Sequence, residues 1–352
     1  MLLSNGSGFD QVWMTGDPEQ NANWIGGWHV GAGDRHVAGD FDGDGSSELW
    51  VHNGGWAALW HSTGRDFQQA WISGDPGQNA NWVDGWHLGA QDRYVAADFT
   101  GDGRDDLFVR SDQWAALLVS DGDHFHVEAM TGDPAKGWNW IGPVHLANPD
   151  DVEYAAQLHY LPQHGVFQAR SDHTTAAFLP LAGDDGFYFD ASWVGPPEFA
   201  ARDQVRPNQR YLTGRFVESD SDAVVVSDGS SLSVWTDIET APALRGRYGP
   251  WIGGWHLGPH DRFTVADLDG DGRDELFVRS SNWAGLLRWQ DAGGLACEWI
   301  SGDPGVKANW VDGWHLSPLD HEVAADVDGT ADRSCSFAPR TGLESSAGPE
   351  RR

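Results

Sequence analysis

The chain has 352 residues, of which 40% are hydrophobic, so it can bury at least one sizeable core. Its formal net charge of −31 opposes binding to a polyanion, which excludes nucleic acid as a partner. No run approaches about 18 consecutive apolar residues, so no segment is expected to insert into a membrane. Only two cysteines are present, Cys297 and Cys335, which excludes a disulfide framework.

The chain begins with two short apolar runs, at residues 2–3 and 9–13, which we expect to be the third and fourth strands of a β unit. This start contains neither the basic segment nor the apolar core of a secretory signal peptide. Either the protein stays inside the cell, or this sequence lacks its true beginning.

A repeat of about 58 residues organises the rest of the chain. The hexapeptide at 40–45 (DFDGDG) recurs at 98–103 (DFTGDG), at 267–272 (DLDGDG) and, in eroded form, at 326–329 (DVDG). An Asn-Trp-(Ile/Val)-x-Gly-Trp-His segment begins at residues 23, 81 and 309, and its final part returns at 251–256. Self-similarity at a fixed period of this length is typical of solenoids and propellers.

Each repeat carries four short apolar runs joined by Gly/Asp turns, and no segment shows an apolar period of about 3.6 residues. Four antiparallel strands per repeat are typical of a propeller blade, whose crowded axis favours the small residues of the first run. We therefore predict one all-β domain over residues 1–332, a β-propeller of about six four-stranded blades. The parent protein could have seven or more blades. The blades are expected near residues 30–72, 88–130, 150–193, 209–252, 261–300, and 321–332 together with 1–14.

The repeat is lost near the end of the chain, so residues 333–352 are expected to form an irregular tail. When the codons for residues 333–346 are read two bases later, the degenerate code permits x-Leu-Phe-Val-Arg-Ser-Ala-x-Trp-Ala-Gly-Val-Leu. That peptide resembles residues 276–287 (LFVRSSNWAGLL) of the fifth blade. We infer a frameshift within the sixth blade and assign Cys335 no functional role; sequencing the gene tests this inference.

The repeated acidic turns have the spacing of calcium loops. Alternate residues of a tight loop point inward, a seventh-position carbonyl adds an oxygen, and Gly at the sixth position allows the sharp turn. Acidic β-turns that merely favour Asp and Gly are the alternative reading. Thr100 weakens the second site, and Thr330 replaces an acid in the sixth. The expected ligands are Asp40, Asp42, Asp44, the Ser46 carbonyl and Glu48; Asp98, Thr100, Asp102, the Arg104 carbonyl and Asp106; and Asp267, Asp269, Asp271, the Arg273 carbonyl and Glu275.

The pattern Asp-x-Asp-x-Asp-Gly-x-x-Asp followed by Leu-Phe-Val resembles the FG-GAP/VCBS repeat of integrin α-subunit propellers and of several propeller lectins. The resemblance covers nearly the whole chain to about residue 332. It implies a propeller with Ca²⁺ bound in the turn between the first two strands of a blade, and an extracellular or cell-surface setting. Because all ligands come from one loop, this calcium is expected to be structural rather than catalytic.

Tryptophan is abundant, with 21 residues, and eight copies lie in the long connections between blades. An indole face beside Asn, Asp and His suits a sugar, because it offers an apolar platform next to partners for hydroxyl groups. The alternative is that each indole packs between blades with its N–H bonded to protein. The eight candidate ligand-binding residues are Trp24, Trp28, Trp82, Trp86, Trp251, Trp255, Trp310 and Trp314.

No catalytic motif is recognisable: the chain has no Gly-x-Ser-x-Gly elbow, no His-Glu-x-x-His and no phosphate loop. The sequence therefore favours a calcium-stabilised binding module for carbohydrate or an extracellular protein. A polysaccharide-acting lyase or hydrolase on the same scaffold is the alternative, and a scaffold fragment with no ligand of its own is a third.

Overall fold

Short strands joined by tight turns make up all of the regular secondary structure in the described part of the computed structural model. No helix there is long and apolar enough to cross a membrane. The structure describes residues 1–5, 9–12, 23–31, 33–73, 81–112, 114–131, 139–146, 148, 150–157, 163–170, 175–183, 186–195, 209–217, 222–237, 242–281, 283–301, 310–312, 314–318, 320–327, 329 and 334–338.

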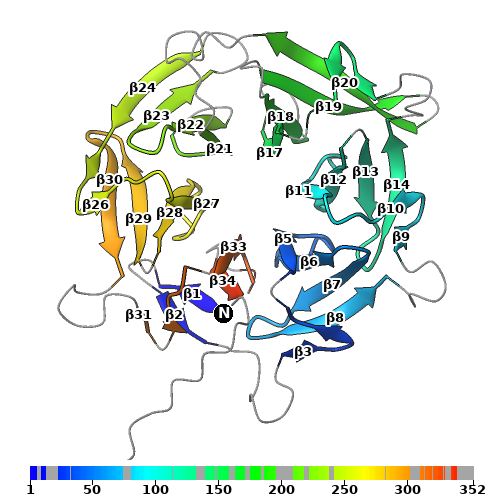
Figure 1. Ribbon diagram of the computed structural model, residues 1–352, viewed down its shortest axis with the longest axis horizontal. Coiled ribbons are helices and arrows are strands. Elements are labelled where there is room, and N and C mark those ends of the chain that lie inside the picture. The colour runs from blue at the N-terminus through cyan, green and yellow to red at the C-terminus, as the bar shows by residue number, and fades with distance from the viewer. Residues whose placement is uncertain are drawn as a thin grey trace, which may run out of the picture.

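Six four-stranded antiparallel sheets stand around a central channel as the blades of a β-propeller (Figure 1), and five of them are each formed by one continuous segment. In sequence order these five are β5 (Arg35–Gly39), β6 (Glu48–Asn53), β7 (Trp56–Ser62) and β8 (Phe67–Ile72); β11 (Arg93–Ala97), β12 (Asp106–Arg110), β13 (Ala115–Ser120) and β14 (Phe125–Met130); β17 (Val152–Ala156), β18 (Gly165–Ala169), β19 (Thr175–Gly183) and β20 (Gly186–Gly195); β21 (Arg210–Gly214), β22 (Ala223–Ser227), β23 (Leu232–Thr236) and β24 (Ala243–Tyr248); and β27 (Arg262–Ala266), β28 (Glu275–Ser280), β29 (Trp283–Gln290) and β30 (Gly294–Ile300).

The sixth sheet combines segments from both ends of the chain. Its strand order is β33 (His321–Ala325), β34 (Ser334–Ala338), β1 (Leu2–Ser4) and β2 (Phe9–Gln11). The expectation of an irregular tail from residue 333 therefore needs correction for Ser334–Ala338, because this segment pairs along its length with β33. Residues 339–352 lie outside the described part of the chain, and the frameshift stays a prediction.

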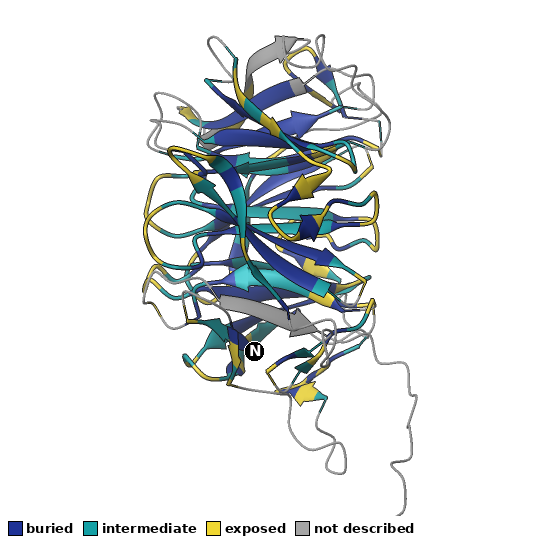
Figure 2. Cartoon of the chain, turned by 90° about the vertical axis from the view of Figure 1, so that its left-hand side faces the viewer, coloured by how far each residue is buried: buried dark blue, intermediate teal, exposed yellow. Residues whose placement is uncertain are grey.

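Crowding at the ring axis explains the composition of the first strands, which line the channel. A Cβ added at Gly39 would lie 2.9 Å from the Phe41 ring, and one at Gly214 would lie 2.7 Å from the Asp274 carboxylate. The second strands carry apolar side chains on both faces because both faces pack on neighbouring blades, and β12 is buried along its length. Figure 2 shows the buried residues within the blades and exposed residues in turns at the rims.

Neighbouring blades are joined beside the channel by reciprocal hydrogen bonds between their acidic turns. The Asp105 carboxylate accepts the N–H of Asp40 at 2.9 Å, and the N–H of Asp105 donates to the Asp40 carbonyl at 2.7 Å. These bonds fix each turn relative to the next blade. The same two bonds recur in two further pairs, Gln157 with Asp222 and Arg215 with Asp274.

Buried ion pairs join the blades at the opposite end of the inner strands. Glu153 of the third blade forms ion pairs with Arg110 and Arg93 of the second blade, the latter at 3.0 Å. Glu322 of the sixth blade likewise receives Arg279 at 2.6 Å. Arg110 and Glu153 are almost completely buried, so each depends on the other for compensation of its charge.

We expect Glu153→Gln to lower the free energy of unfolding by about 3–5 kcal/mol, because it leaves the buried Arg110 without its counter-ion. Asp291→Asn is the matched control, since the Asp291 carboxylate pairs with Arg273 and is 71% exposed. Its cost should stay below about 1 kcal/mol. Urea denaturation followed by fluorescence measures both, and equal losses would contradict this account.

Candidate functional site

The described part of the chain contains five two-stranded hairpins that precede blades and follow one sequence pattern. The copy at 139–145 was not recognised from sequence, because Val144 replaces the second tryptophan; Trp140 and His145 at the same spacing are the signal that identifies it. The hairpins pair β3 (Trp24–Ile25) with β4 (Trp28–His29), β9 (Trp82–Val83) with β10 (Trp86–His87), β15 (Trp140–Ile141) with β16 (Val144–His145), β25 (Trp251–Ile252) with β26 (Trp255–His256), and β31 (Trp310–Val311) with β32 (Trp314–His315).

A two-residue turn closes each hairpin, and its first residue has a positive φ, which favours Gly or Asp in such turns. Asp84 and Asp312 occupy this position with φ of 49° and 47°. The Asp84 carboxylate also accepts the N–H of Val127 on β14 at 3.0 Å. The Asp312 carboxylate accepts the N–H of Gln11 on β2 at 3.0 Å. The turns therefore attach the hairpins to the outermost strands of the blades.

The second tryptophan of a hairpin is part of the core. The Trp86 indole is 4% exposed, packs in the cluster between the first and second blades, and donates its N–H to Asp92 at 2.9 Å. Most of its ring is therefore covered by the blades, although it lines a pocket beside the hairpin; the expectation that this tryptophan contacts a ligand stays a prediction. The corresponding indoles donate in the same way in the other hairpins: Trp28 to Asp34, Trp255 to Asp261, and Trp314 to Asp320.

The first tryptophan faces solvent in four of the five described hairpins, and Trp310 of the last is intermediate in burial. Trp82 is 44% exposed and Trp251 is 64% exposed. The His87 ring meets the Trp82 indole at 4.8 Å between centroids and hydrogen-bonds the Asn81 side chain. The same Trp–His contact occurs in all five hairpins, at centroid distances of 4.5–5.0 Å. Each hairpin thus presents an apolar ring face held beside a polar imidazole.

A pocket of about 610 Å³ opens beside the second hairpin. Trp82 and His87 form one part of its wall, and Trp114 and Met130 of the second blade form another. The sequence analysis did not select Trp114 as a ligand-binding candidate, because the opening of a strand gives no sign of which blade surface its side chain borders. The polar lining includes Gln91, Asp92, Ser111 and Asp112.

The acidic turns hold their carboxylates through backbone donors. In the first turn, Asp40 accepts the N–H groups of Gly43 at 2.8 Å and Gly45 at 3.1 Å. One carboxylate oxygen from each of Asp40, Asp42 and Asp44 can lie within 4.8 Å of the others. The fifth turn brings together Asp267, Asp269 and Asp271 in the same way. The arrangement fits a hard cation that takes carboxylate oxygens at flexible geometry.

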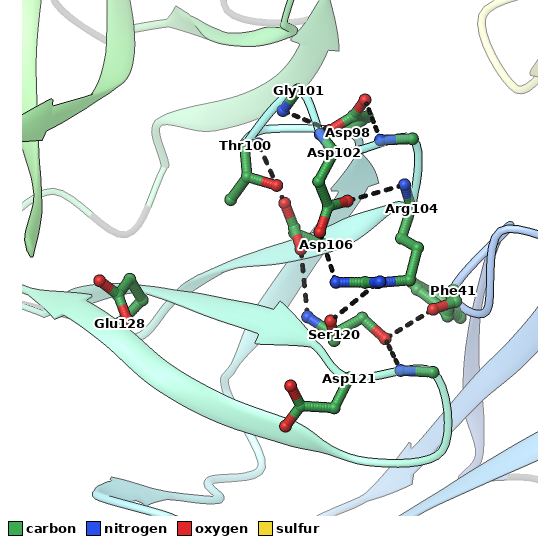
Figure 3. Close-up of polar contacts among 12 residues, drawn as sticks. Phe41, Asp98, Thr100, Gly101, Asp102, Arg104, Asp106, Ser120, Asp121 and Glu128 are labelled. Carbon is green, nitrogen blue, oxygen red and sulfur yellow. Dashed lines mark hydrogen bonds and ion pairs between the residues drawn. The ribbon is translucent and has the colours of Figure 1, made fainter.

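The second turn differs because its third position is Thr100. Figure 3 shows the Arg104 guanidinium lying on the Asp102 carboxylate and donating to the Ser120 carbonyl at 3.1 Å. Arg104 was expected to contribute only a carbonyl oxygen, and its side chain instead neutralises the turn from within. In the fifth turn the Arg273 guanidinium points away to Asp291 at 2.7 Å.

Burial perturbs the ninth-position carboxyls of these turns. It raises the pKa of Glu48 to about 8, with a further contribution from Asp42, and raises the pKa of Asp106 and of Glu275 to about 7. The pKa of each of these carboxyls is higher in the folded state than in the unfolded state. The metal-free fold is therefore most stable when they are protonated, and it loses stability as the pH rises through their folded-state pKa values. A bound cation would compensate the ionised carboxylates.

No protein-family model matches the sequence, and no curated protein matches it either. A lectin of Agrocybe aegerita that recognises non-reducing terminal N-acetylglucosamine is similar in structure, with 13% identity and a TM-score of 0.51 over 88% of this chain and 76% of the lectin. The Tc holotoxin pore of Photorhabdus luminescens has 15% identity and a TM-score of 0.51 over 88% of this chain, but only 13% of that chain. These likenesses show the propeller fold.

Trp86→Ala should lower the free energy of unfolding by about 3–5 kcal/mol, because it opens a cavity between two blades and leaves Asp92 without its indole donor. Trp82→Ala should cost less than about 1 kcal/mol, since much of that ring is already in water. Chemical denaturation compares the two variants. A large loss for Trp82→Ala would mean that this residue too serves packing.

Proposed function

We propose that this propeller is a carbohydrate-binding module that uses the exposed tryptophans of its hairpins, with the pocket beside Trp82 as the principal site. The observation that carries the proposal is the division within the pairs Trp24/Trp28, Trp82/Trp86 and Trp251/Trp255. One indole is buried with its N–H satisfied, whereas its neighbour in the same hairpin keeps an open face beside a histidine. Packing alone does not account for the second arrangement.

The pocket has the chemistry that a sugar ring requires. The Trp82 face offers an apolar surface for the C–H groups of a pyranose, and Trp114 borders the pocket from the blade. His87, Gln91 and Asp112 supply donors and acceptors for hydroxyl groups from the same wall. Five hairpins repeat the Trp–His pair around the ring, so several weak sites can act together on a branched or clustered glycan.

The proposal includes calcium as a structural ion in the first and fifth turns. Asp40, Asp42 and Asp44 supply clustered oxygens in the first turn, and the equivalent trio supplies them in the fifth. Burial opposes ionisation of Glu48, the ninth-position acid of the first turn, which also supports a cation there, whereas Glu275 of the fifth turn pairs with Arg288. The resemblance to FG-GAP/VCBS repeats supports the same ion and an extracellular setting, where calcium is abundant.

A glycan array probed with the full chain tests the sugar proposal. We expect selective binding to a defined glycan, and titration with that glycan should show at least about tenfold weaker binding for Trp82→Ala, or about 1.4 kcal/mol. Tyr188→Ala is the control, because Tyr188 is an exposed aromatic on β20 outside the hairpins. A blank array with folded protein would overturn the sugar proposal and redirect the search to a protein ligand or polysaccharide cleavage.

Calcium should raise the thermal midpoint of unfolding, and chelation should reverse the rise. An ion at about a hundred times its Kd adds about 2.7 kcal/mol. The double variant Asp44→Asn with Asp271→Asn should lose most of this gain, because each change removes a ligand from one trio. Asp291→Asn serves as the control. Unchanged midpoints for the wild type in calcium and in chelator would count against a calcium role.

A further inference from the structure

The first acidic turn contains a second group of metal-ligating side chains that includes a histidine. Asp42 and Glu48 belong to the turn between β5 and β6, and His61 projects to them from β7. One ligand atom from each of the three lies within 4.8 Å of the other two. His61 is far from the turn in sequence, so the acidic motif alone gives no indication of it.

In the fifth blade, a positively charged side chain occupies the position that corresponds to His61. Arg288 occupies the place of His61 in the repeat, at the same distance along the chain from the ninth-position acid. Its guanidinium donates to Glu275 at 3.0 Å and forms an ion pair with Asp269. Those two acids are the counterparts of Glu48 and Asp42. In the fifth blade a cationic side chain therefore lies between these two carboxylates, and the first blade places His61 at the same position.

In the first blade, His61 takes this position in place of an arginine. Its Nδ1 lies 3.5 Å from Asp42 Oδ2, and its Nε2 is buried without a hydrogen-bond partner. Glu48 Oε2 is held by the N–H groups of Phe41 at 2.8 Å and Asp42 at 3.3 Å. The carboxylate is thus oriented by the backbone, as ligands of metal centres usually are by their neighbours.

We propose that Asp42, Glu48 and His61 form a binding site for a first-row divalent transition metal ion of the zinc type. One imidazole nitrogen and two carboxylates are a ligand set that suits zinc and its neighbours, whereas calcium takes oxygen ligands. The site shares Asp42 with the all-oxygen trio and Glu48 with the full set of calcium ligands expected in this turn, and it differs from both by its imidazole nitrogen. It is independent of the sugar-binding proposal.

Cobalt titration of the untagged full chain tests this site, with calcium present in excess and Zn²⁺ affinity measured by competition. We expect one equivalent of Co²⁺ to give visible ligand-field bands that Zn²⁺ abolishes. His61→Val and His61→Arg take the residues that the second and fifth blades carry at this position, Val119 and Arg288. Both variants should bind Zn²⁺ at least about 100-fold more weakly.

His126→Val is the control, because the His126 side chain on β14 is 38% exposed and pairs with surface acids; it should leave the cobalt spectrum unchanged. Circular dichroism checks that each variant is folded, and His61→Arg provides the test if His61→Val is not. A wild-type chain without cobalt bands would overturn the proposal. Equal Zn²⁺ affinity in wild type and His61→Arg would do so as well, as would displacement of cobalt by calcium alone.

Discussion

Crowding at the ring axis is the constraint on which the rest of this propeller depends. Each first strand ends on Gly or Ala because the neighbouring turn leaves no space for more, and the chain then enters the turn that meets the next blade. The reciprocal bond between Asp40 and Asp105 uses that closeness to join blades directly. As a consequence, carboxylates are dense around the channel, and Asp105, Asp222 and Asp274 all border it.

The blades differ in which side chain compensates the negative charge of the acidic turn. The second blade places Arg104 on its own turn, and the fifth brings Arg288 from its third strand. The first blade has His61 at the position of Arg288, and burial raises the pKa of its Glu48 to about 8. Small substitutions on one shared backbone thus give the turns different partners for their carboxylates: Arg104 in the second, Arg288 in the fifth and His61 in the first.

Periodicity and turn chemistry were sufficient to predict an all-β propeller of about six blades, because both are local properties of the sequence. The same local properties could not predict which of the two tryptophans in a hairpin is buried and which is exposed. Trp82 and Trp86 share the same neighbours in sequence, and only the docking of the hairpin between blades buries one and exposes the other. His61 and Arg288 were missed for the same reason, since strand pairing rather than spacing brings them to the acidic turns.

The shared sixth sheet joins segments that lie far apart in the sequence. β1 pairs with β34, and Leu2 lies opposite Cys335, so closure of the ring needs a contact of very long sequence separation. While β34 is not docked, β1 presents an open strand edge that another chain could pair with. Contacts of long sequence separation slow folding. Closure of the ring is therefore a step at which slow pairing and an exposed strand edge coincide.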